Sequence, residues 1–140
     1  MMRRILSVSY DQSLLRTRQM ILEAKGYEVD SCANMDESLR HCREDNFDLF
    51  ILGHSIPSVD KQMLVATFHC SCPAPIISLR THPGDDVVAD ADYYLQPDPE
   101  ALLELVAEIF EKKRPRGDTV LQQIARYALK TWHASRRYFR

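Results

Sequence analysis

Residues 48–57, with the sequence DLFILGHSIP, constrain the fold of this chain more than any other segment. The four consecutive apolar residues at 49–52 suit a strand of a parallel sheet that is covered by helices on both faces. In such sheets, functional groups lie beyond the carboxyl ends of the strands. Gly53, His54 and Ser55 therefore occupy a place where a functional site is expected.

Strand-like and helix-like segments alternate along the chain, and we expect a doubly wound α/β fold. Segments that are apolar or alternate in polarity predict strands at 3–9, 27–32, 49–52, 75–79 and 93–95. Apolar residues at helical spacing predict helices at 14–25, 34–45, 58–68 and 98–112. Asp11 or Ser13, and then Asn34, are suitable N-caps, and Gly26 is a suitable stop for the first helix.

Each predicted helix has apolar residues at helical spacing. In the helix at 34–45, Leu39 and Cys42 are expected to point inward. In the first helix the apolar residues that define the inward face are Leu14, Leu15, Met20, Ile21, Leu22 and Ala24. In the helix at 58–68 they are Met63, Leu64, Val65 and Phe68. Both sets fall mostly on one side of a helix, which predicts burial against the sheet.

The chain has 140 residues, enough for one domain and a tail. No apolar run approaches the ~20 residues that span a bilayer, and the first residues lead into a strand pattern without a signal-peptide core. We therefore expect a cytoplasmic protein. Reduced thiols are then the default state of the four cysteines. The cluster His69, Cys70 and Cys72 offers too few ligands for a structural zinc site, so neither a metal nor another cofactor is expected.

The charge distribution divides the chain into two parts. Residues 112–140 carry nine Lys or Arg and one acid, for a net charge of +8, whereas residues 1–111 carry nine basic and nineteen acidic residues, for −10. Pro115 and Gly117 interrupt the preceding helix pattern. We therefore predict a domain at 1–113 and a basic amphipathic helical tail at 114–140, which has an apolar stripe that includes Leu121 and Trp132.

Several segments resemble landmarks of the receiver domains of response regulators, the CheY-like family. They are DLFILGHSIPSVD from residue 48, GYEV at the second strand, PIISL at the fourth, ADYYLQP at the fifth and PEALL at the last helix. The resemblance covers residues 3–112. It implies a flavodoxin-like five-stranded parallel sheet with strand order 2-1-3-4-5 and a role in bacterial two-component signal transduction and phosphorelays.

The residues at the family's phosphorylation pocket differ in this chain. Receivers have an acidic pair after the first strand, a phospho-accepting Asp after the third, a Ser or Thr after the fourth, and a Lys before Pro after the fifth. Transfer to a carboxylate needs that nucleophile and a Mg²⁺ ion held by acids. The matching positions here are Ser9, Tyr10, Gly53, Arg80 and Gln96. The resemblance therefore predicts a pseudo-receiver that accepts no phosphoryl group, holds no metal and is not an enzyme.

Two further differences concern signalling surfaces. Only twelve residues separate Arg80 from Tyr93, fewer than the family usually has, so we expect a fourth helix that is shortened or absent. Tyr93 matches the family's aromatic switch position. Because Arg80 replaces the hydroxyl to which that ring normally responds, Tyr93 is predicted to be a fixed packing or interface residue.

These observations leave three functional hypotheses. The first is a pseudo-receiver that acts through protein–protein interaction with a signalling partner or a second copy of itself. The second is the sensing of a small ligand or anion in the altered pocket, where Arg80 and His54 offer donors. The third is a nucleic-acid-binding regulator that uses the basic tail, although one short helix is less than a helix-turn-helix unit.

Overall fold

The computed structural model describes residues 2–81 and 91–112. Its strands are β1 (Arg4–Val8), β2 (Glu28–Cys32), β3 (Leu49–Leu52), β4 (Ile76–Leu79) and β5 (Tyr93–Leu95). Its helices are α1 (Gln12–Glu23), α2 (Met35–Glu44), α3 (Ser58–Ser71) and α4 (Pro99–Lys112). The five strands form one parallel sheet in the order β2-β1-β3-β4-β5, which confirms the predicted order.

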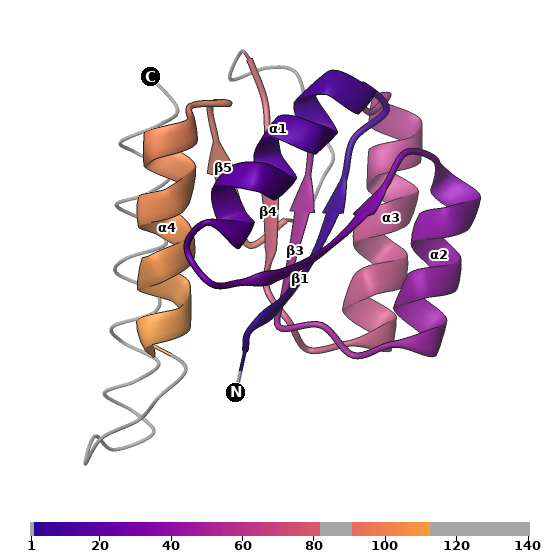
Figure 1. Ribbon diagram of the computed structural model, residues 1–140. Helices are drawn as coiled ribbons and strands as arrows, with labels where there is room; N and C mark the ends of the chain where they lie inside the picture. The colour runs from indigo at the N-terminus through magenta and orange to yellow at the C-terminus, as the bar shows by residue number, and fades with distance from the viewer. Residues whose placement is uncertain (1, 82–90, 113–140) are drawn as a thin grey trace.

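The sheet separates two hydrophobic layers (Figure 1). Helices α1 and α4 cover one face, and α2 and α3 lie side by side on the other. The central strand β3 supplies both layers: Leu49 and Ile51 belong to the core under α1 and α4, whereas Phe50 and Leu52 belong to the core under α2 and α3. All four side chains are fully buried, which explains the uninterrupted apolar run in this strand.

The predicted end signals of the first two helices are confirmed. The Asp11 side chain accepts hydrogen bonds from the backbone N–H groups of Ser13 and Leu14, so Asp11 is the N-cap of α1. Asn34 accepts the N–H of Glu37 and caps α2 in the same way. Gly26 has a φ of 90°, a left-handed conformation that favours glycine after a helix.

The predicted inward faces of α1 and α3 are partly wrong. In α1 the buried residues are Leu15, Arg18 and Leu22, whereas Met20 is 64% exposed. A residue two positions after Arg18 is rotated by about 200° around the helix and therefore points away from the sheet. In α3, Met63 is 52% exposed. There the buried residues are Lys61, Leu64, Val65 and Phe68. In each helix a basic residue occupies a core position and a methionine is exposed.

Two boundaries differ from the sequence prediction. Helix α3 continues to Ser71, beyond Phe68. Strand β4 begins at Ile76 because Pro75 has no N–H to donate, although its carbonyl accepts the N–H of Phe50. The predicted loss of a fourth helix concerns residues 82–90, and the tail at 114–140 also lies outside the described residues. No helix in the described ranges is long and apolar enough to cross a membrane.

Candidate functional site

The strand register brings the residues after β1 and β3 into contact. Val8 pairs with Leu52, and the N–H of Gly53 donates to the Val8 carbonyl at 2.8 Å. Ser9 is fully buried, and its Oγ lies 3.1 Å from the Oγ of Ser55. A Cβ atom added at Gly53 would lie 3.2 Å from the Ser9 Cβ, the Ser9 Oγ and the Val8 oxygen. The space beside the Gly53 backbone is therefore already occupied by Ser9.

The other two residues of the first loop make structural contacts. The phenol of Tyr10 donates to the Asp60 carboxylate of α3 at 2.9 Å. Burial, together with this contact to Asp60, raises the pKa of Tyr10 to about 12. Asp11 is the N-cap of α1, and its carboxylate accepts two backbone N–H groups. This loop therefore offers one carboxylate, and the start of a helix already uses it.

His54 and Arg80 line the same cavity, as the anion hypothesis requires. This cavity has a volume of about 300 Å³, and its polar residues are His54, Ser55, Ser58, Lys61 and Arg80. The guanidinium of Arg80 also lies over the ring of Tyr94, with its Cζ 3.9 Å from the ring centroid. This stacking is a cation–π contact that holds the guanidinium over the ring of Tyr94.

Lys61 is a site residue that the sequence reasoning missed. It is 1% exposed, and its Nζ donates to the Leu79 carbonyl at the end of β4 at 2.9 Å. This places an ammonium group beside the loops after β3 and β4. The signal was its spacing: Lys61 lies three and four residues before the buried Leu64 and Val65, on the same side of α3.

The two predicted residues of β5 and its loop lie in different surroundings. Tyr93 is 1% exposed and belongs to the core under α1 and α4. Its ring is therefore an inward-facing packing residue in this structure, as one of the two predicted roles requires. Gln96, at the family's lysine position, is exposed, and its carbonyl accepts the N–H of Asp98 at 2.7 Å.

Two groups of side chains in the described residues have the composition of metal ligands, and both lie near β2 and α2. One contains Cys32, Glu37 and His41, and the other contains Asp30, His41 and Asp45. Burial, with the nearby Glu37, raises the pKa of the Cys32 thiol to about 12, and Arg4 pairs with both Asp30 and Asp45. Neither group includes a residue of the loops after β1, β3 or β4. The described residues of these loops therefore form no group of carboxylates suited to Mg²⁺.

The cysteines are free thiols, as predicted. Cys32 and Cys42 are buried, and Cys70 is exposed. Cys72 donates to the Phe47 carbonyl at 3.4 Å.

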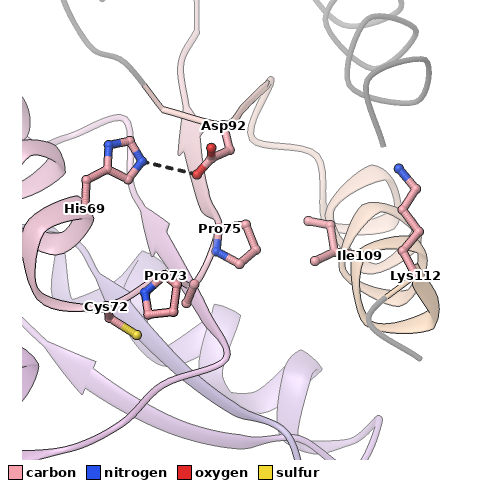
Figure 2. Close-up of a pocket in the computed structure, with 8 residues that line it drawn as sticks. His69, Cys72, Pro73, Pro75, Asp92, Ile109 and Lys112 are labelled. Carbon is pink, nitrogen blue, oxygen red and sulfur yellow. Dashed lines mark hydrogen bonds and ion pairs between the residues drawn. The ribbon is translucent and has the colours of Figure 1, made fainter. Parts of the chain in front are cut away.

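A separate cavity lies at the opposite, amino-terminal end of β4 (Figure 2). It has a volume of about 310 Å³ and opens between the end of α3 and the end of α4. His69 Nε2 lies 3.3 Å from Asp92 Oδ2, and the same carboxylate oxygen accepts the N–H of Ile76 at 2.8 Å. The pair thus ties α3 and the segment before β5 to the first residue of β4, which is a structural role.

Comparisons with known proteins agree with this architecture. The chain is 31% identical over 122 residues to the transcriptional regulatory protein PrrA of Mycobacterium bovis, and equally to that of Mycobacterium tuberculosis. The match covers 83% of this chain and 52% of each relative, so the chain spans about half the length of the curated relatives it matches. No protein-family model matches the chain.

Solved structures show the same fold. A CheY-like response regulator receiver domain from Methanospirillum hungatei superposes with a TM-score of 0.70 and 28% identity, over 79% of this chain and 96% of that one. Response regulator TrrA of Thermotoga maritima, solved in complex with Mg(2+)-BeF, gives a TM-score of 0.66 and 26% identity over 77% and 99% of the two chains. Together with the strand order and the register at the carboxyl ends, these likenesses show that the chain contains a receiver domain of the response-regulator, CheY-like kind.

Proposed function

We propose that this receiver domain does not accept a phosphoryl group at the family's position and acts in bacterial two-component signalling as a pseudo-receiver, through contacts with protein partners. The observation that carries the proposal is the Ser9–Gly53 contact. Gly53 has no nucleophilic side chain, and Ser9 fills the adjoining space to within 3.2 Å of where a Cβ would lie.

The surroundings of Gly53 support the same conclusion. A Mg²⁺ ion needs several hard oxygen ligands with negative charge. In the first loop, Ser9 and Tyr10 replace the acidic pair, and Asp11 is used as a helix cap. Gln96 is neutral and exposed where the family has a lysine. At the positions that match the family's nucleophile, acidic pair and lysine, this chain therefore has Gly53, Ser9, Tyr10 and Gln96, and we expect no enzymatic activity.

Incubation of the full chain with Mg²⁺ and acetyl phosphate, followed by intact mass spectrometry, tests this proposal. We expect no phosphoryl adduct relative to a sample without donor. A matched Gly53→Asp variant is also expected to stay unmodified, because no acidic pair holds the metal. A stable adduct on the wild-type chain would overturn the proposal, and peptide mapping would then locate the acid that accepts the phosphoryl group.

A protein contact is supported by exposed apolar side chains. Val59 is 74% exposed and Met63 is 52% exposed, and they lie four residues apart on α3. Residues at this spacing share one face of a helix. If the partner is another protein, a Met63→Lys variant should capture less of it from an extract of the native host than the wild-type chain does. If the partner is a second copy, the variant should have a lower sedimentation coefficient than the wild-type chain at high concentration. Thr17→Lys, on the exposed part of α1, is the control.

Anion sensing is a second candidate, which the shared cavity of His54, Lys61 and Arg80 favours. Two basic side chains and His54 around about 300 Å³ suit an inorganic phosphate or sulfate ion. Phosphate should then raise the Tm of the wild-type chain at constant ionic strength, and Arg80→Ala should abolish the increase. The hypothesis of nucleic-acid binding concerns residues 114–140, outside the described part of the chain, and stays a prediction.

A further inference from the structure

A small cavity lies between α1 and the start of α4, on the side of the sheet away from α3. Its volume is about 80 Å³. It is lined by the apolar side chains of Leu14, Ile21, Leu79 and Leu102, together with Arg18 and His54. Its walls therefore combine apolar side chains with one guanidinium, one imidazole and, at the start of α4, the carboxylate of Asp98. This composition suits a small amphipathic molecule.

Arg18 is unusual because its guanidinium is buried and forms no ion pair with a carboxylate of residues 2–81 or 91–112. The residue is only 6% exposed. Its hydrogen bond within the described residues is from Nη1 to the Ser7 Oγ, at a long 3.4 Å. No carboxylate among the described residues forms an ion pair with it. Burial lowers the pKa of the guanidinium to about 10. Because a buried charge is costly unless it is paired, this arrangement favours an anion from outside.

His54 is the second indication of a ligand. Its Nδ1 is buried and has no hydrogen-bond partner among the described residues. The nearest acid that lines the cavity, Asp98, is exposed, and its Oδ1 accepts the N–H of Glu100 at 3.1 Å in the first turn of α4. Asp98 is thus engaged as a helix cap. The cavity is therefore lined by Arg18 of α1, whose hydrogen bond to Ser7 is long, and by His54 of the loop after β3, whose Nδ1 has unused hydrogen-bonding capacity among the described residues.

We propose that this cavity binds a small aliphatic monocarboxylate, with its carboxylate on Arg18 and its alkyl group between Leu14, Ile21 and Leu102. Arg18 offers a planar fork of donors that matches a carboxylate, and His54 offers one more donor when Nδ1 is protonated. A volume of about 80 Å³ suits a ligand of a few carbon atoms and is too small for a nucleotide. The apolar walls favour an alkyl carboxylate over a phosphate ion, whose larger charge is costlier to desolvate.

This proposal goes beyond the proposed function, since it concerns the cavity between α1 and α4 and needs no phosphoryl chemistry. His54 lines both this cavity and the cavity of Lys61 and Arg80. A bound carboxylate would contact α1, the end of β4 and the start of α4, three elements that also share one hydrophobic core. The ligand would act as a stabiliser of one arrangement of these elements, because a ligand that binds only the folded arrangement shifts the equilibrium toward it.

Thermal unfolding of the full chain in sodium propionate tests the proposal, with sodium chloride at equal ionic strength and pH as the reference. At propionate concentrations tenfold above its dissociation constant, we expect Tm to rise by about 5 °C. Propionamide, which has the same shape without the charge, should give no increase. In two-dimensional ¹H–¹⁵N NMR spectra, the propionate-induced shifts should concentrate at Thr17, Ile21 and Leu102.

Two variants separate this site from general salt effects. Arg18→Met removes the charge and keeps a long apolar side chain, and it should abolish the propionate response. Thr17→Phe narrows the cavity from its exposed rim while leaving Arg18 intact, and it should abolish the response as well. Arg16→Met, on the exposed side of the same helix, is the control and should respond like the wild-type chain.

Several outcomes would overturn the proposal. One is a propionate response that persists in both Arg18→Met and Thr17→Phe, since the carboxylate would then bind elsewhere. Another is a response to phosphate that exceeds the response to propionate and disappears only in Arg80→Ala, which would assign the anion to the cavity of Lys61 and Arg80. A third is the absence of any Tm increase or NMR shift in the wild-type chain. The failure of the pseudo-receiver proposal is separate, because it would appear as a phosphoryl adduct in the mass spectrum.

Discussion

In the described part of the chain, each face of the sheet buries one basic side chain, and the two side chains have different hydrogen-bond partners. Under α2 and α3, the ammonium of Lys61 donates to the backbone carbonyl of Leu79 at 2.9 Å. Under α1 and α4, the hydrogen bond of the Arg18 guanidinium within residues 2–81 and 91–112 is to the Ser7 hydroxyl, at 3.4 Å. A buried cation with a good backbone acceptor is a structural element. A buried cation without a counter-charge marks a place where a ligand is expected.

The difference follows from where each helix begins. The first turn of α3 lies beside the carboxyl ends of β3 and β4, and it supplies both Asp60, which accepts from Tyr10, and Lys61. The polar groups of Asp60 and Lys61, beside the family's phosphorylation pocket, are therefore engaged in hydrogen bonds within the domain. Arg18 lies in the middle of α1, about two turns after its N-cap Asp11, and its guanidinium contacts the Ser7 hydroxyl of β1. Strand interiors use their carbonyls in the sheet, so Arg18 meets a side-chain hydroxyl instead.

Replacing Lys61 by Met should have the largest effect. The methionine keeps most of the apolar stem, but the Leu79 carbonyl loses the buried donor it has from Lys61, so we expect a loss of about 1–3 kcal/mol in the free energy of unfolding. Urea denaturation monitored by circular dichroism measures this change. Lys25→Met, at an exposed lysine after α1, should stay within about 0.5 kcal/mol of the wild-type chain. Equal stability of the Lys61 and Lys25 variants would contradict the structural role of Lys61.

The same substitution at Arg18 should have the opposite sign. Arg18→Met removes a desolvated charge that has no counter-charge in the described part of the chain, so we expect between no change and a gain of about 2 kcal/mol in the free energy of unfolding. The measurement is again urea denaturation, in a buffer without carboxylates, with Arg16→Met as the control. A loss comparable to that of Lys61→Met would break the comparison, because it would mean that Arg18 already has a strong partner in the native protein.

The architecture could be predicted from the sequence because it depends on many residues. The fully apolar β3, the alternation of strand and helix and the caps Asp11 and Asn34 agree with one another, so a single misjudged position changes nothing. The contact of Ser9 with Gly53 also follows, because parallel strands in register bring the residues after them together. Of the positions predicted at the family's pocket, Ser9 and Gly53 lie in contact, whereas Gln96 is exposed and its carbonyl accepts the N–H of Asp98.

The two buried cations could not be predicted in the same way. A single basic residue in an amphipathic helix is usually exposed, so Met20 and Met63 were expected inside while Arg18 and Lys61 were not considered for the core. Spacing held the signal: Arg18 lies three residues after Leu15 and four before Leu22, on the buried side of α1. Whether a buried cation at such a position has a hydrogen-bond acceptor depends on which part of a strand lies beside it. The sequence spacing does not show this, because it depends on how the elements pack in three dimensions.

The contact between Tyr10 and Asp60 is a second partnered contact of the first turn of α3, and its disruption should have the smallest effect of the three predictions. Burial and Asp60 raise the pKa of the Tyr10 phenol to about 12 in the folded chain, above the ordinary value of about 10 in the unfolded chain. Its contribution to stability is therefore complete below pH 10 and is lost as the pH rises toward 12, because the unfolded chain gives up this proton first. The ultraviolet difference spectrum between wild type and Tyr10→Phe should show no phenolate near pH 10.5.

Asp60→Asn removes the acceptor charge while keeping the size of the side chain, so it should move the Tyr10 titration to lower pH. An unshifted titration in Asp60→Asn would mean that burial alone sets the pKa of Tyr10. The hydrogen bond from Tyr10 to Asp60 would then be weaker than the hydrogen bond from Lys61 to the Leu79 carbonyl.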